Sequence, residues 1–219
     1  VGWQRQANGP SVQAAIEDVL TEMHGGHVTT IRGAGRTDAG VHALGQVAHF
    51  DAPPTARIPA HGYQRGLNAV LPRSIAILAA EPVADDFDAR FSARGKLYRY
   101  SIWTAPVRAP LRDRYVWHLR RAIDAARMHQ AAQALVGRHD FSAFRASDCE
   151  RKTTVRTLGR LAVARSAELV TVEIEADAFL KNMVRILVGT LAEVGWGKRP
   201  PDDVRRVLER LASGTVMTY

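Results

Sequence analysis

The 219-residue sequence contains a single cysteine, Cys149, and this scarcity excludes several classes of protein. One thiol forms no intramolecular disulfide and builds no cysteine-based zinc site, so the fold depends on its core, as is typical of a reducing cytosol. The sequence also lacks any apolar run near the roughly 20 residues that span a bilayer. Its first six residues do not resemble a signal peptide. We therefore expect a cytoplasmic protein that makes no use of a membrane.

Acidic residues are fewer than basic ones. Thirty Lys and Arg stand against 22 Asp and Glu, which gives a net charge of +8, and no single run holds the excess. Basicity spread in this way favours a polyanionic partner, most simply a nucleic acid. The alternative is a soluble basic protein without such a partner. With 46% hydrophobic residues, the chain is long enough to bury a core as one large domain or two small halves.

The spacing of hydrophobic residues, together with Gly, Pro and Ser at positions that begin or end such elements, predicts a mixture of helices and strands in each half. Helices are predicted at 12–23, 63–71, 123–135, 179–194 and from Pro201 to Gly214. Strands are predicted at 28–31, 46–50, 74–83, 96–103, 115–119, 157–164 and 169–176. This order favours an α+β fold, with helices packed on a mostly antiparallel mixed sheet, over a doubly wound parallel sheet. We expect an N-terminal α+β half at 1–105 and a C-terminal α+β half at 106–219.

The most informative segment is the glycine-rich loop at 33–43, which places Asp38 beside Arg36 directly after a predicted strand. Glycines allow positive φ or close approach to a ligand, so the loop presents one acid at a tight turn. Asp38 stands where a dinucleotide-binding loop needs its third glycine, and no Gly-Lys-Ser/Thr of a phosphate-binding loop follows. An acid there suits a cationic or neutral group, or a sugar carbon under attack. The alternative is a structural turn in which Asp38 bonds its own backbone.

Histidines offer weaker signals. His42 can pair with Asp38 for acid–base chemistry if the segment is helical; otherwise it is a local hydrogen-bonding residue. His24 and His27 provide too few ligands for a metal, so we predict no metal site.

Two further segments combine cations with apolar residues. Lys96 and Tyr98 share one face of a strand, which suits base stacking but also suits a tyrosine at the edge of a core. The helix predicted at 179–194 is apolar on most sides, yet it carries Arg185. A buried guanidinium needs an anion, so we expect Arg185 to meet a carboxylate; the alternative is a side chain that reaches solvent. The segment 139–145 suits either RNA contact or anchoring by its phenylalanines.

Together these segments resemble the TruA-type tRNA pseudouridine synthases. The similarity runs in order through 2–6, the loop 35–43, Phe87 to Ala93, Lys96 to Tyr100, His139 to Phe141 and Phe179 to Arg185, and so covers nearly the whole chain. The Asp38 loop is its most specific element. The resemblance implies the pseudouridine synthase fold, in which two similar α/β halves flank a central basic cleft.

The resemblance also implies roles for individual residues. Asp38 is the expected nucleophile toward a flipped-out uridine, at either the sugar's anomeric carbon or the ring, and Arg185 is its expected ion-pair partner. Tyr98 is expected to stack on the target base and to help move its proton. Arg36 is expected to fill the gap left by the flipped nucleotide or to grip its phosphate. His42, Lys96 and Arg90 complete the expected substrate-binding set.

The implied reaction is an isomerisation that needs no cofactor and no metal. The implied substrate is tRNA, modified at nucleotides 38–40 of the anticodon stem-loop by a homodimer that recognises shape more than base sequence. Two other readings remain: a non-catalytic RNA-binding protein that retains the synthase fold, and an Asp–His hydrolase built on Asp38 and His42. The hydrolase ranks last because no serine or cysteine lies in a nucleophile elbow.

Overall fold

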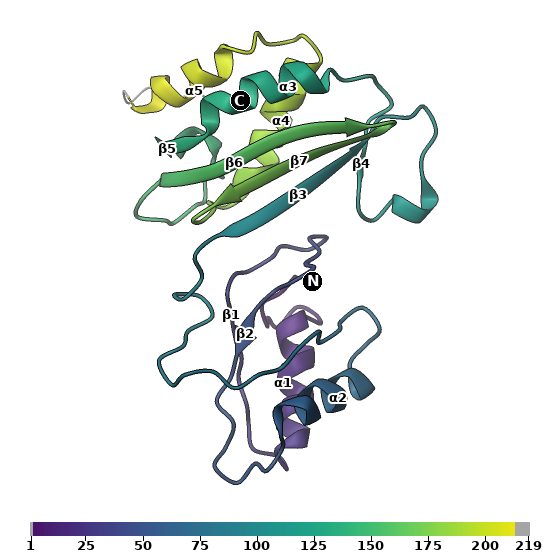
Figure 1. The fold of residues 1–219 in the computed structure, drawn as a ribbon, viewed down its shortest axis with the longest axis vertical. Helices are drawn as coiled ribbons and strands as arrows, with labels where there is room; N and C mark the ends of the chain where they lie inside the picture. Colours follow the sequence, from purple (N-terminus) through teal and green to yellow (C-terminus); the bar gives the residue numbers. More distant parts are fainter. Residues whose placement is uncertain (1, 213–219) are drawn as a thin grey trace. The chain divides into compact units, whose positions relative to one another are not determined.

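A computed structural model describes residues 2–212, and the chain divides into two compact units, Val1–Ala93 and Arg94–Tyr219 (Figure 1). The first unit contains α1 (Val12–Met23), β1 (Arg32–Gly33), β2 (Ala48–His49) and α2 (Ala60–Val70). The second unit contains β3 (Lys96–Trp103), η1 (Pro110–Arg112), β4 (Trp117–His118), α3 (Ala125–Ala132), η2 (Gln133–Leu135), β5 (Gly137–Asp140), η3 (Ser142–Phe144), β6 (Val155–Ser166), β7 (Leu169–Ala176), α4 (Met183–Gly195) and α5 (Asp203–Ala212). The α+β class is confirmed. The predicted halves, 1–105 and 106–219, stay a prediction, although β3 pairs with β7 and therefore belongs to the second compact unit.

The helices of the first unit form where local signals place them. Ser11 caps α1 by accepting a hydrogen bond from the Ala14 N–H at 3.2 Å, and helical spacing buries Ile16 and Leu20. Two glycines with positive φ follow the helix. α2 packs its buried Tyr63 on the same core, and β1 pairs antiparallel with β2.

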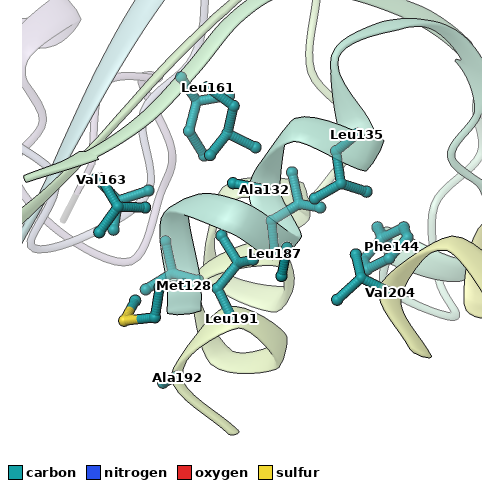
Figure 2. Close-up of a cluster of buried hydrophobic side chains, with 14 of the residues drawn as sticks. Met128, Ala132, Leu135, Phe144, Leu161, Val163, Leu187, Leu191, Ala192 and Val204 are labelled. Carbon is teal, nitrogen blue, oxygen red and sulfur yellow. The ribbon is translucent and has the colours of Figure 1, made fainter. Parts of the chain in front are cut away.

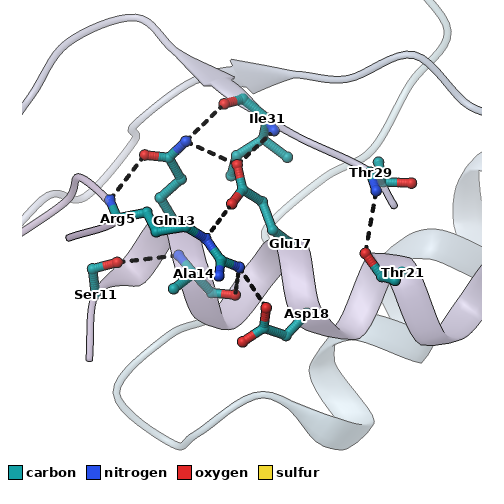
Figure 3. A network of polar contacts seen from close by, with 9 residues as sticks. All are labelled: Arg5, Ser11, Gln13, Ala14, Glu17, Asp18, Thr21, Thr29 and Ile31. Atoms are coloured by element: carbon teal, nitrogen blue, oxygen red, sulfur yellow. Dashed lines mark hydrogen bonds and ion pairs between the residues drawn. The ribbon is translucent and has the colours of Figure 1, made fainter. Parts of the chain in front are cut away.

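The strand predictions at 28–31 and 74–83 in the first unit are wrong. These segments are bonded by helix side chains rather than by a neighbouring strand. The Glu17 carboxylate on α1 accepts the Ile31 N–H at 3.0 Å (Figure 3). Asn68 on α2 both accepts from and donates to the backbone of Ile77. Glu17 is buried and also accepts from Arg5 and Gln13, so one carboxylate ties the chain start to α1 and to the approach to β1.

The second unit is a five-stranded sheet with one face covered by helices (Figure 1). The strand order is β4-β3-β7-β6-β5, and every neighbouring pair is antiparallel except β3 with β4. Alternate residues of β7, Val170, Val172 and Ile174, are fully buried, as expected when one face of a sheet meets a core. Side chains from α3, α4 and α5 fill that core (Figure 2). Among the helices formed by the described residues, none is long and apolar enough to cross a bilayer.

The elements that position the C-terminal site residues differ in detail from expectation. α4 begins at Met183 rather than at Phe179, because Asn182 adopts a left-handed conformation with φ 59°. Lys181 therefore lies outside the helix, where it pairs with Asp148 at 2.5 Å. Phe141 and Phe144 are buried, so the segment at 139–145 anchors its loop in the core. α5 is confirmed, but its predicted end at Gly214 lies outside the described residues.

Candidate active site

The Asp38 loop leaves β1 and folds into a tight turn. The Val41 N–H donates to the main-chain oxygen of Asp38 at 3.1 Å, and Gly40 at the third position has φ 78°. This is the conformation of a type II turn, which requires glycine or asparagine there. The backbone carbonyl of Asp38 thus closes the turn, and the side chain is not used for that purpose.

The start of the chain holds this loop in place. The Trp3 N–H donates to the Thr37 oxygen at 3.0 Å, and a Cβ on Gly2 would collide with the same oxygen. The Trp3 ring, which is 7% exposed, lies so close to Gly33 that a Cβ there would be 2.5 Å from it. These contacts fix the loop at its root and one residue before the acid.

The returning strand adds two more hydrogen bonds to the loop. The Gln46 side-chain amide donates to the Gly35 oxygen at 2.6 Å, and the Ala34 N–H donates to the Val47 oxygen at 2.8 Å. These backbone hydrogen bonds fix the position of the loop, so the exposed carboxylate of Asp38 is not needed to hold it. A carboxylate that is held in place and still exposed is suited to act as a nucleophile.

Two other predicted residues of the first unit, Arg36 and His42, flank this turn in the sequence. Arg36, Asp38 and His42 are all exposed, and Arg90 is exposed on a separate turn. Residues 38–42 do not form a helix, so the helical geometry proposed for a pair between Asp38 and His42 is wrong.

The second unit brings the predicted tyrosine to the approach to α4. Tyr98 and Lys96 are half-buried on the core-facing side of β3, where the Tyr98 ring packs edge-on against Phe179 with centroids 4.8 Å apart. Phe179 lies four residues before α4, and Arg185 is exposed in the first turn of that helix. The expectation that the Arg185 guanidinium is buried is therefore wrong. Its side chain reaches solvent and is available to a partner.

The predicted site residues thus fall into two groups. Asp38, Arg36, His42 and Arg90 belong to the first unit, whereas Lys96, Tyr98 and Arg185 belong to the second. The ion pair between Asp38 and Arg185 joins the groups and stays a prediction. Within the described part of the chain, no three His, Cys, Asp or Glu side chains gather as metal ligands.

Sequence reasoning did not assign a role to Gly2, Trp3 and Gln46, which position the loop. The contact of Trp3 with Gly33 spans 30 positions of sequence, so local pattern carries no sign of it. The available signal was the place of Gly2 and Trp3 within the segments that carry the family resemblance.

Comparison with known proteins gives a consistent result. Residues 2–92 and 131–216 match the family described as tRNA pseudouridine synthase. Proteins named tRNA pseudouridine synthase A are similar to this chain over most of its length. The one from Syntrophotalea carbinolica is 51% identical over 208 residues, which cover 95% of this chain and 81% of the relative. The one from Myxococcus xanthus is 50% identical, covering 95% and 78%, and the one from Agrobacterium fabrum is 46% identical, covering 98% and 82%.

Proposed function

This chain belongs to the tRNA pseudouridine synthase family, and from that premise we propose that it converts uridine to pseudouridine in tRNA, with Asp38 as the nucleophile. The observation that carries the proposal is the loop around Asp38. It presents one exposed carboxylate on a turn that is fixed by Trp3, Gln46 and Gly40. The basic composition of the chain supports an RNA substrate, because Lys and Arg neutralise phosphates.

The reaction balances without an oxidant or a second substrate. A carboxylate oxygen of Asp38 bonds to the nucleoside, at the anomeric carbon or at the ring, and the bond between N1 and C1′ breaks. The uracil turns, C5 bonds to C1′, the C5 proton leaves to solvent, N1 takes up a proton, and the Asp38 adduct is released. Asp38 therefore ends in the form in which it started.

The remaining residues position the nucleoside in this scheme. Arg185 pairs with Asp38, keeps it ionised and aims it, because an opposite charge favours the carboxylate form. Tyr98 stacks on the target base and helps to move its proton, and Arg36 replaces the flipped nucleotide in the helix or holds its phosphate. His42, Lys96 and Arg90 contact the RNA around it.

The finer assignments of this proposal are supported by the resemblance to the TruA-type synthases. The target uridines lie at nucleotides 38–40 of the anticodon stem-loop, and the working enzyme is a cytoplasmic homodimer. Transcribed tRNAs that keep a single uridine at one of these positions test the first assignment. Sedimentation of the purified protein, alone and with tRNA, tests the second.

The decisive experiment measures release of tritium from tRNA labelled at C5 of uracil. Wild-type protein should release label to water, and Asp38→Ala should release none while it still binds tRNA. Asp51→Ala removes another exposed carboxylate of the same unit and should behave as wild type. Binding without release by the wild type would favour a non-catalytic RNA-binding protein, and turnover by Asp38→Ala would refute the assigned nucleophile.

A further inference from the structure

Phe91 is an apolar side chain displayed to solvent on a rigid turn. The residue is 81% exposed, and among the described Phe, Tyr and Trp residues of the first unit only Phe91 is exposed. Exposing a phenylalanine forgoes the free energy that burial of so large a ring normally contributes. A ring held in water in this way is available to an external partner.

The turn that carries the ring is locked by its own hydrogen bonds. The Asp88 carboxylate accepts from the N–H groups of Arg90 at 2.8 Å and Phe91 at 2.9 Å, and the Ser92 N–H donates to the Asp88 carbonyl at 2.7 Å. These backbone bonds, that from Phe91 foremost, lower the pKa of Asp88 and so favour its carboxylate form. The ring is therefore presented in one orientation, which reduces the entropy lost on binding.

The same turn is attached to the root of the Asp38 loop. Ala89, which is buried, donates its N–H to Nδ1 of His49 on β2 at 3.0 Å. His49 lies opposite Arg32 in the pairing of β2 with β1, and β1 leads directly into the loop. A ligand bound at Phe91 is thus tied through one strand pair to the loop that carries Asp38.

The charges beside the ring identify the kind of ligand. The guanidinium of Arg90 lies 5.7 Å from the centre of the Phe91 ring, and Arg32 on β1 interacts electrostatically with the Asp88 carboxylate of the same turn. An aromatic face beside cations suits a nucleobase and its phosphates, because the base stacks on the ring while the cations hold the backbone. A second copy of this chain would bring the same cations against each other.

We propose that Phe91, with Arg90 beside it, is a stacking platform for an unpaired base of the RNA substrate, distinct from the uridine that reacts at Asp38. This inference rests on the proposed function, since it takes RNA as the ligand. It assigns Phe91 to substrate binding and not to the chemical steps.

Substitutions at Phe91 test the platform, because base stacking and simple apolar contact predict different orders of tRNA affinity among the variants. Affinity for unmodified transcribed tRNA should fall about tenfold in Phe91→Ala, within roughly 5- to 150-fold, the range for loss of one stacked base. Phe91→Trp and Phe91→Tyr should keep wild-type affinity, whereas Phe91→Leu should resemble Phe91→Ala. The rate at saturating tRNA should change less than twofold in all of them. Leu78→Ala, which shortens another exposed apolar side chain of the same unit, should have no effect.

A spectroscopic measurement separates stacking from other losses. 2-Aminopurine placed singly at unpaired positions of the anticodon arm should be quenched by wild-type protein at one position at least, and that quenching should disappear in Phe91→Ala. Affinity of Phe91→Ala within twofold of wild type, or wild-type affinity in Phe91→Leu, would overturn the platform. A change of oligomeric state in Phe91→Ala with unchanged RNA affinity would assign the ring to contact between copies instead.

The two proposals fail separately. Absence of tritium release by wild-type protein counts against the synthase activity, whatever the Phe91 series shows. Normal release together with a flat Phe91 series removes the platform and leaves the activity in place.

Discussion

The contact between Trp3 and Gly33 yields the sharpest test of how the loop is positioned. In Gly33→Ala the new Cβ would lie 2.5 Å from Cζ2 and 2.7 Å from Cε2 of the indole. Carbon atoms prefer a separation of at least about 3.5 Å, so one side must move by about 1 Å. The indole cannot swing away freely, because it is buried and the Trp3 backbone bonds to both Thr37 and Gln13.

Either movement reaches the carboxylate. If Trp3 shifts, its hydrogen bond to Thr37 moves with it; if Gly33 shifts, the root of the loop moves. Overpacking of this kind costs about 1–3 kcal/mol of stability, and a displacement of about 1 Å at a reacting group can cost about a hundredfold in rate. We expect Gly33→Ala to unfold about 1–3 kcal/mol more easily and to lose between about tenfold and a hundredfold in kcat/KM.

A double-mutant cycle measured by urea unfolding and tritium release tests the reasoning. Trp3→Phe replaces the indole with a smaller ring. When it is combined with Gly33→Ala, it should restore part of the stability and rate that Gly33→Ala loses, with a favourable coupling of about 0.5–3 kcal/mol. Gly45→Ala is the matched control, because its Cβ meets nothing within 4 Å and its φ is not positive; it should be neutral or slightly stabilising. Wild-type stability and rate in Gly33→Ala, or strictly additive effects in the double variant, would refute the close contact.

Two further predictions concern charge. Arg185→Lys should lower kcat/KM about tenfold or more in the tritium assay, because lysine keeps the charge but loses the two-pronged guanidinium; Arg206→Lys on α5 is the control, and equal rates would remove the pairing with Asp38. His24 bonds Thr29 and Tyr63, and burial, aided by His27, lowers its pKa. The unfolded chain then binds more protons below about pH 6.5, so the thermal midpoint should fall as pH drops through that value. His24→Gln should flatten this dependence, and identical pH profiles would contradict it.

The fold was predictable where local chemistry decides it. Ser11 and the spacing of Ile16 and Leu20 specify α1, and period-two alternation specifies β3, β6 and β7. The strand prediction at 74–83 is wrong because alternation of apolar residues does not reveal which groups bond the backbone. Here Asn68 of a helix takes the place of a strand.

The sequence indicated which residues to propose for the site, but it did not indicate the contacts that hold the Asp38 loop in place. Glycines around a lone acid marked Asp38, and the type II turn at Gly40 is the physical reason for one of them. The start of α4 was placed four residues early because a left-handed Asn182 leaves no trace in hydrophobic spacing. The supports of the loop lie far away in sequence, so only the folded chain reveals them.

The burial of Trp3 against the loop also makes it a natural optical probe. The other three tryptophans, Trp103, Trp117 and Trp196, all belong to the second unit. Replacing those three with phenylalanine would leave one emitting indole in van der Waals contact with Gly33. Its emission would then follow, in real time, how the Asp38 loop responds when RNA is added and when it dissociates.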